Sequence, residues 1–226
     1  EGRQSTLMGL KGMPSLSEEI MIRRDLNLLE YTGGRIHFTM VSTKTGLDLI
    51  REAKNRGLNV TCDVGVNYLF FTEDDLADYD THLKVNPPYR TKEDRLALIE
   101  GVKDGTVDCI VSDHIPQDEE SKKLEFDMAE FGSSNQQTFL AVLHKVFGEE
   151  MLNYLSLFTE KPRKLLSLPS VSIEVGAEAS LSLFNFDDWA FNNSTNKSKS
   201  LASPFLGQNL KGKVIGIVNN GQLILN

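Results

Sequence analysis

The sequence has no long apolar run, no excess of positive charge and few cysteines. No stretch approaches the roughly 18 apolar residues of a membrane-spanning helix, and the first residues lack the apolar core of a signal peptide. Its 226 residues carry a net charge of −8, whereas nucleic-acid binding needs a basic surface. We therefore expect a cytoplasmic protein that binds neither membrane nor nucleic acid.

Metal-binding motifs are also missing. The two cysteines, Cys62 and Cys109, fall in separate predicted strands and are too few for a disulfide framework, so buried free thiols are expected. The histidines form no H-x-H or H-E-x-x-H pair, and no C-x-x-C pair occurs. Because zinc sites need several such ligands to converge, local motifs by themselves indicate no zinc site.

What is present is an alternation of strands and helices. Apolar runs predict strands over 35–41, 59–64 and 107–112, and capped periodic segments predict helices before, between and after them. This order is typical of an α/β fold with a parallel sheet and crossover helices. Three such strands fall short of the eight of a closed barrel.

The sequence pattern changes after Pro162. The segments ASLSLFNF, KVIGIVNNG and QLILN read as short strands separated by Asn-Gly and Gly turn signals. We predict one unit over residues 1–167, built on the parallel sheet, and a small β module over residues 168–226.

Asp113 and His114 follow the strand over 107–112 directly. Barrel enzymes keep metal ligands and proton acceptors at the carboxyl ends of parallel strands, so Asp113 is a candidate catalytic residue and metal ligand. The alternative is a turn or cap residue, since aspartate is common where strands end. His37 lies within a strand, where a hydrogen-bonded core histidine is the simpler interpretation.

The phrase NPPYR contributes Asn86 and Arg90. Asn86 offers a donor and an acceptor, and Arg90 could hold a substrate carboxylate through two hydrogen bonds. Both are candidate substrate-binding residues. The alternative is a rigid connecting loop, because the two prolines forbid regular pairing there.

Several longer phrases occur in a characteristic order, among them GLKGMPSLSEE, RIHFTMVST, VTCDVGVNYL, HLKVNPPYRTKEDRLALIEGVKDGTVDCIVSDHIP and FGSSNQQT. With them the chain resembles the C-terminal portion of class I dihydroorotases, of the amidohydrolase superfamily. The resemblance implies part of a TIM-like (β/α)8 barrel with a small β-sandwich-like module. It also implies reversible cyclisation of carbamoyl aspartate in pyrimidine biosynthesis, with zinc-activated water and a catalytic, metal-ligating aspartate at Asp113.

The chain departs from the family phrases at ligand positions. Met40 stands at the histidine of H-V-S-T, and a thioether is a poor zinc ligand. Where the family has T-P-H-H, this chain has Gly65-Val66-Asn67-Tyr68. Where the family phrase D-H-A-P-H ends in a histidine, this chain has Gln117. Residues 131–138 occupy the place of F-G-x-x-G-x-E-T. The family's H-x-H, bridging and fifth-strand ligands belong upstream of this segment. The resemblance therefore implies degenerate metal-site motifs, and it leaves two alternatives: zinc as the family cofactor, or no metal bound in this chain.

Three hypotheses stay open at this point. The chain could be a catalytically inactive homologue that serves as a structural partner of aspartate carbamoyltransferase. It could be an active hydrolase that uses upstream ligands, with Asp113 as proton shuttle. It could also bind a small molecule through Asn86 and Arg90 without chemistry. Because three parallel strands leave open edges, we expect that either the missing half of the barrel covers them in the native protein, or another copy of the chain (a homo-oligomer) or a partner does.

Overall fold

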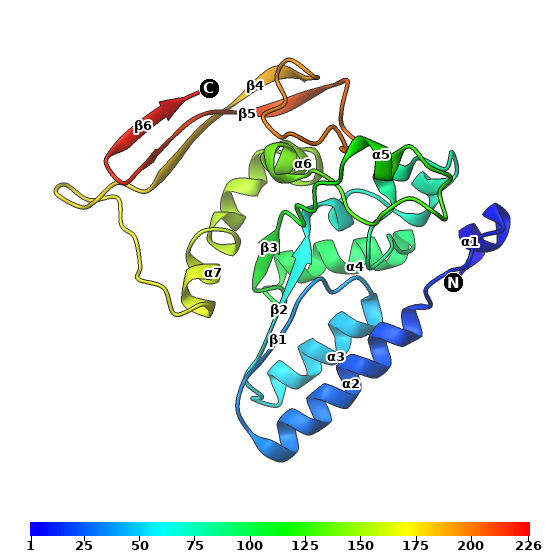
Figure 1. Cartoon of the computed structure of the whole chain (residues 1–226). Coiled ribbons are helices and arrows are strands. Elements are labelled where there is room, and N and C mark those ends of the chain that lie inside the picture. The colour runs from blue at the N-terminus through cyan, green and yellow to red at the C-terminus, as the bar shows by residue number, and fades with distance from the viewer.

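The computed structural model describes all 226 residues and contains two separate sheets. Three parallel strands, β1 (Ile36–Phe38), β2 (Val60–Gly65) and β3 (Cys109–Val111), lie in the order β1-β2-β3. The connections run through α3 (Lys44–Asn55) and α4 (Lys92–Lys103), while α2 (Ser15–Thr32) precedes β1 and lies beside α3 (Figure 1). The predicted parallel sheet with crossover helices is confirmed.

Two of the strands, β1 and β3, are shorter than the sequence predicts, and β1 shows why. Met40 has a positive φ of 58°, which turns the chain out of the extended conformation two residues after β1 ends. The Met40 N–H then donates at 2.7 Å to the side-chain carboxylate of Asp63 on β2 rather than to a backbone carbonyl of that strand. The apolar run therefore continues past the point where sheet pairing stops.

Helix α3 begins and packs as its sequence predicts. Thr43 caps α3 by accepting a hydrogen bond from the Gly46 N–H at 3.0 Å. The buried face of α3 carries Leu47, Ile50 and Ala53. A Cβ atom on Gly101 of α4 would lie 2.5 Å from the Leu47 side chain, so glycine permits the close approach of α3 and α4. This packing fixes the loops at the carboxyl ends of the strands.

The helices between β3 and the second sheet are short. These are α5 (Glu119–Lys122), η4 (Gln136–Thr138), α6 (Phe139–Phe147), η5 (Gly148–Leu157) and α7 (Glu160–Leu165), and the N-terminal segment carries α1 (Arg3–Met8). Three further 3-10 turns, η1 (Val66–Leu69), η2 (Glu73–Leu76) and η3 (Thr81–Leu83), follow β2. The segment EMLNYLSLF, for which the apolar pattern predicts an α-helix, thus lies in a 3-10 helix. No helix is both long and apolar enough to cross a membrane.

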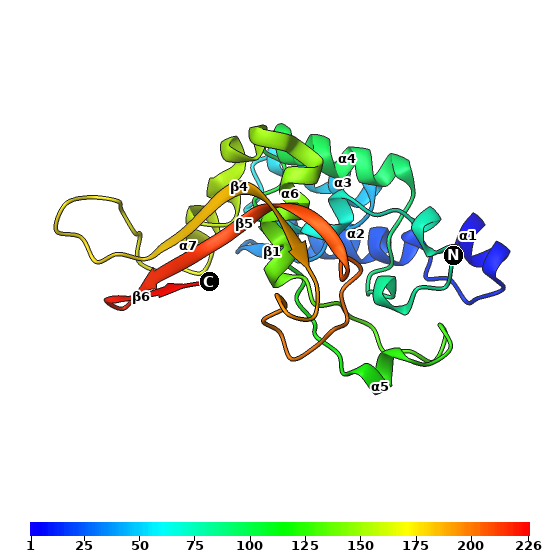
Figure 2. The ribbon, with the colours of Figure 1, turned by 90° about the horizontal axis from the view of Figure 1, so that it is seen from above.

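The second sheet is antiparallel and consists of β4 (Leu181–Phe191), β5 (Gln208–Asn219) and β6 (Gln222–Leu225). Asn220 and Gly221, both at positive φ, form the tight turn between β5 and β6. Seen from above, β4 and β5 extend across α6, which β5 contacts (Figure 2). Phe191, Phe205 and Leu210 share one core with the parallel sheet, and the boundary at residue 168 stays a prediction.

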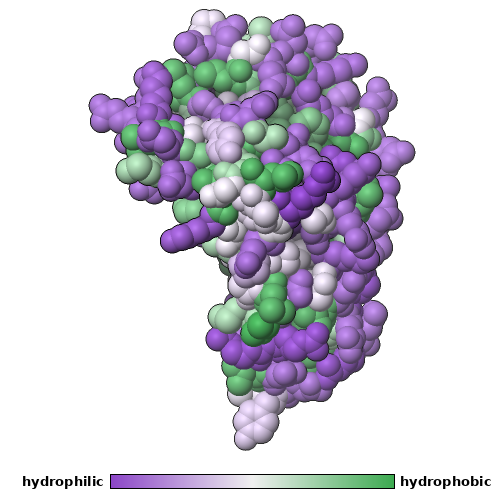
Figure 3. All heavy atoms as spheres, turned by 90° about the vertical axis from the view of Figure 1, so that its right-hand side faces the viewer, coloured by the Kyte–Doolittle hydropathy of each residue, from purple (hydrophilic) through white to green (hydrophobic).

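Apolar side chains also remain at the surface. Hydrophobic patches lie among the hydrophilic side chains of the face in Figure 3. The outward side of α2 exposes Leu16, Ile20, Leu28 and Tyr31, and β6 is exposed along its whole length. The expectation that another copy or partner covers such surfaces stays a prediction.

Candidate functional site at the carboxyl ends of the parallel strands

Asp113 lies two residues beyond β3, at the carboxyl end of the parallel sheet as the sequence predicts. Its φ of 48° is in the left-handed region, which aspartate tolerates better than most residues. Burial, and then the nearby Asp63 carboxylate, raise the pKa of Asp113 to about 6, and no hydrogen bond to the carboxylate counteracts them. Asp113 is therefore a partly buried carboxyl group that can exchange a proton near neutral pH.

His114 is turned toward the backbone of the following segment. Its Nδ1 atom accepts hydrogen bonds from the Asn135 N–H at 3.1 Å and the Gln136 N–H at 3.2 Å. Two donors at Nδ1 assign the proton to Nε2, and burial lowers the pKa of His114. The imidazole therefore caps the start of η4 in its neutral form.

Asp63 of β2 is a second buried carboxylate at this end of the sheet. It accepts hydrogen bonds from His37 Nε2 at 2.8 Å, the Met40 N–H at 2.7 Å and the Thr39 hydroxyl at 3.3 Å. His37 Nδ1 lies 2.8 Å from the Thr61 hydroxyl. His37 is thus a fully hydrogen-bonded strand residue. Sequence reasoning missed Asp63, whose signal was a lone carboxylate inside the apolar strand VTCDVG.

The space above Gly65, the last residue of β2, is filled by apolar and aromatic side chains. A Cβ atom at Gly65 would lie 2.8 Å from the Tyr68 ring and 2.9 Å from the Met40 methyl group. Tyr68 is buried, its hydroxyl donates to the Pro87 carbonyl, and its ring centroid lies 5.0 Å from that of Tyr89. Met40 and Tyr68, two of the departures from the family phrases, therefore close over the strand end.

This packing leads to a first prediction. Gly65 has ordinary φ and ψ angles of −73° and 138°, so alanine brings no backbone strain there. We expect Gly65→Ala to lower the free energy of unfolding by about 1–3 kcal/mol, because the added methyl group meets the rigid Tyr68 ring. Thermal or urea denaturation measures the change. An unchanged midpoint would mean that the ring does not lie over Gly65.

Asn86 and Arg90 are placed differently from each other. Asn86 is exposed and precedes a cis peptide bond to Pro87. Arg90 is buried, and its guanidinium donates to the Met13 carbonyl at 2.6 Å and the Ser42 hydroxyl at 3.1 Å. It also borders an open cavity of about 850 Å³ that the N-terminal segment and the loop over 83–91 enclose. Their substrate-binding roles stay predictions.

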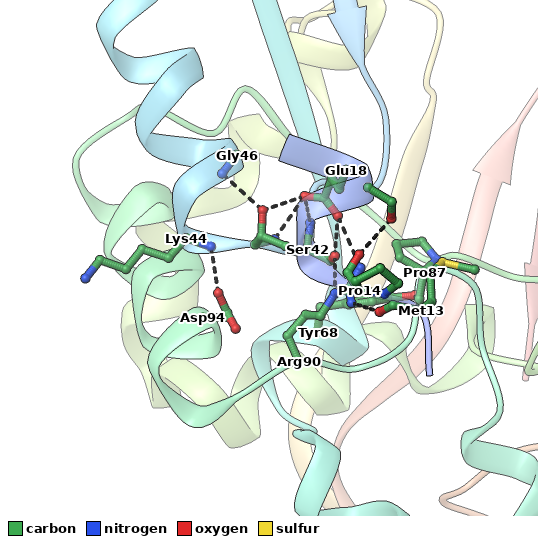
Figure 4. A network of polar contacts seen from close by, with 12 residues as sticks. Met13, Pro14, Glu18, Ser42, Lys44, Gly46, Tyr68, Pro87, Arg90 and Asp94 are labelled. Atoms are coloured by element: carbon green, nitrogen blue, oxygen red, sulfur yellow. Dashed lines mark hydrogen bonds and ion pairs between the residues drawn. The ribbon is translucent and has the colours of Figure 1, made fainter. Parts of the chain in front are cut away.

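Glu18 of α2 organises the surroundings of Arg90. Its carboxylate accepts hydrogen bonds from the N–H and hydroxyl groups of both Ser42 and Thr43, three of them at 2.9–3.0 Å. Arg90 Nη2 lies 3.9 Å from the same carboxylate. Figure 4 shows Glu18, Ser42 and Arg90 pointing toward one another from three separate segments. This network joins α2, the β1–α3 loop and the NPPYR loop.

The side chains of this chain do not by themselves fit a metal site. No group of three or more histidine, cysteine, aspartate or glutamate residues lies close enough to hold an ion. His114 Nδ1 and both oxygens of Asp63 are occupied by hydrogen bonds, and Gln117 donates to the Phe131 carbonyl at 2.7 Å. Asp113, the predicted metal ligand, has a carboxylate that makes no hydrogen bond.

No protein-family model matches the chain. Its sequence is 38% identical to the dihydroorotase of Anaplasma phagocytophilum over 229 aligned residues, which cover 99% of this chain and 51% of that protein. The chain is a dihydroorotase homologue. Its motifs correspond to those of the C-terminal portion of dihydroorotases. The chain spans about half the length of the curated relatives that it matches.

Solved structures agree with the fold of this dihydroorotase homologue. The L-hydantoinase (dihydropyrimidinase) from Arthrobacter aurescens superposes with a TM-score of 0.85 at 29% identity, over 95% of this chain and 50% of that one. The inactive dihydroorotase-like domain of the Chaetomium thermophilum CAD-like multifunctional protein superposes with a TM-score of 0.62 at 24% identity, over 88% and 53%. The prediction of a partial amidohydrolase barrel with a β module is confirmed.

Proposed function

We propose that this protein is a dihydroorotase-like component of pyrimidine biosynthesis that lacks cyclic amidohydrolase activity and acts as a structural partner. The observation that carries the proposal is the closed strand end, where Met40 and Tyr68 pack over Gly65. The homologous phrases of the family have histidines at positions 40 and 68. Aliphatic and aromatic packing has taken the place of imidazole ligands.

The chemistry of amide hydrolysis supports this proposal. Without a cation, water keeps a pKa of about 15.7, compared with about 7 when zinc binds it. Zinc is the cofactor that family resemblance implies, and it would supply this activation. Asp113 could then accept a proton, but one carboxylate does not hold zinc, so we derive no catalytic step through a metal.

The proposed partner role rests on two observations. The Chaetomium relative is described as an inactive domain of a CAD-like multifunctional protein. In the present chain, β1 and β3 are edge strands, and α2 carries exposed apolar side chains. We propose aspartate carbamoyltransferase as the partner, together with self-association of this protein.

The test is an assay of the purified full-length protein. We expect less than stoichiometric zinc by elemental analysis and no hydrolysis of dihydroorotate above the uncatalysed rate. Co-purification with aspartate carbamoyltransferase, followed by analytical ultracentrifugation, examines the structural role. Stoichiometric zinc together with dihydroorotate turnover would refute the proposal.

A second candidate function has one specific observation in its favour. The Asp113 carboxyl is partly buried, lacks hydrogen bonds and has a pKa raised to about 6, as a proton acceptor in an active hydrolase requires. Such an enzyme would use metal ligands upstream of this chain. Asp113→Asn would then abolish turnover in the full-length protein, and an unchanged rate would exclude this role.

A further inference from the structure

Two asparagines at the carboxyl end of the parallel sheet join the ends of β2 and β3. Asn67 lies in η1 directly after β2, Asn135 lies beside the turn after β3, and both are fully buried. Asn67 Nδ2 donates to Asn135 Oδ1 at 2.9 Å. Asn135 Nδ2 in turn donates to the Asp113 carbonyl at 2.8 Å.

The direction of both amides follows from the end of this series. The Asp113 carbonyl can only accept, so Asn135 must present its NH2 group to it. The Asn135 oxygen therefore faces Asn67, which must present its own NH2 group. Each asparagine is needed as an amide, because a carboxylate of the same shape would lack the donor.

The same contacts hold the turn that carries Asp113 and His114. Asp113 adopts a positive φ of 48°, a conformation that surrounding contacts must stabilise in a residue other than glycine. Asn135 holds the Asp113 carbonyl with its side chain and His114 Nδ1 with its backbone N–H. One residue thus anchors two consecutive positions of the turn.

Both asparagines are departures from the family phrases. Asn67 stands at the first histidine of T-P-H-H, and Asn135 stands at the second glycine of F-G-x-x-G. Glycine has no side chain for this contact, so the pair requires both changes. We propose that Asn67 and Asn135 form a paired-amide clamp, which fastens the ends of β2 and β3 and holds the Asp113 turn in this chain.

The clamp goes beyond the proposed function, and its test reads stability rather than activity. Asn67→Asp in the full-length protein replaces the donor with a carboxylate that faces the Asn135 oxygen. We expect the unfolding constant at pH 8 to rise about tenfold or more, because a buried acceptor then loses its partner and a charge is buried. At pH 5 the loss should shrink, because burial raises the pKa of the new carboxyl and its protonated form can donate.

The surrounding titratable groups are the same in the unsubstituted protein and in Asn67→Asp. Their contributions therefore cancel when the unfolding free energies of the two proteins are subtracted. The groups are the Asp63 and Asp113 carboxylates at the strand ends, His114, and the buried hydroxyls of Tyr68 and Tyr89, whose pKa values burial raises. Asn193→Asp is the control, because Asn193 is exposed. It should leave the unfolding constant within about twofold at both pH values.

A double-mutant cycle keeps the proposal testable if Asn67→Asp does not fold. Asn67→Ala, Asn135→Ala and the double variant should be non-additive by about fivefold or more in the unfolding constant, because the two side chains share one hydrogen bond. Additive losses would overturn the clamp. So would an Asn67→Asp loss of equal size at pH 8 and pH 5. Neither outcome depends on whether dihydroorotate is hydrolysed.

Discussion

Glu18→Ala is expected to destabilise the protein by about 3–5 kcal/mol, the largest effect of any single change considered. The carboxylate receives four hydrogen bonds from Ser42 and Thr43, and Arg90 lies 3.9 Å away with a side-chain exposure of 7%. Its removal leaves the backbone N–H groups of Ser42 and Thr43 without an acceptor, and it leaves the buried Arg90 guanidinium without its paired carboxylate. Urea denaturation of the full-length variant measures the loss.

The neighbouring Glu19 supplies the control. It is the next residue along α2, and it is outside the network. We expect Glu19→Ala to change the free energy of unfolding by no more than about 0.5 kcal/mol. Equal effects of the two substitutions would show that the Glu18 network does not hold the three segments together.

Asp113→Asn is expected to stabilise the protein at neutral pH. The folded protein holds the Asp113 proton up to a pKa of about 6, whereas the unfolded chain releases it near about 3.9. This group therefore lowers stability progressively as pH rises from about 4 to 6. The rise in pKa corresponds to about 3 kcal/mol for a fully buried carboxyl, and the partial exposure of Asp113 reduces it to about 1–2 kcal/mol.

The stabilisation by Asp113→Asn should be small at pH 4 and constant above about pH 7. Asparagine keeps the backbone contact of Asp113 with Asn135 and tolerates the positive φ. Asp63→Asn is the matched comparison and should destabilise by about 1–2 kcal/mol, since it weakens charge-assisted hydrogen bonds. Unfolding curves between pH 4 and pH 8 would decide. If Asp113→Asn lost stability as Asp63→Asn does, the Asp113 carboxylate would have to make stabilising contacts, which would contradict the structure.

The fold was predictable to the extent that it depends on local patterns. The three apolar runs and the capped helices between them correctly predict parallel strands with crossover connections. Strand ends were less predictable, since β1 stops where Met40 turns away to bind Asp63, a residue 23 positions later in the chain. The 3-10 helix η5 likewise replaces an expected α-helix, although its apolar residues suit either form.

The site was predictable in its location but not in its contacts. Asp113 could be placed at a strand end because an apolar run stops there. The hydrogen-bond partners of the Asp63, Arg90 and Asn135 side chains lie 22 to 77 residues away along the chain, so no local pattern contains them. Arg90 illustrates the difference, because its charge suggested a ligand for substrate, yet protein groups bind two of its nitrogens.

The sequence by itself determined the ancestry of this protein, its alternation of strands and helices, and the loss of imidazole at positions 40 and 68. These properties depend only on residue types and on short spacings along the chain. Only the tertiary structure decided what the residues at the former histidine positions contact: Met40 and Tyr68 pack over Gly65, and Asn67 pairs with Asn135. The physical reason is that packing and hydrogen bonding depend on which distant segments meet, and the folded sheet alone brings them together.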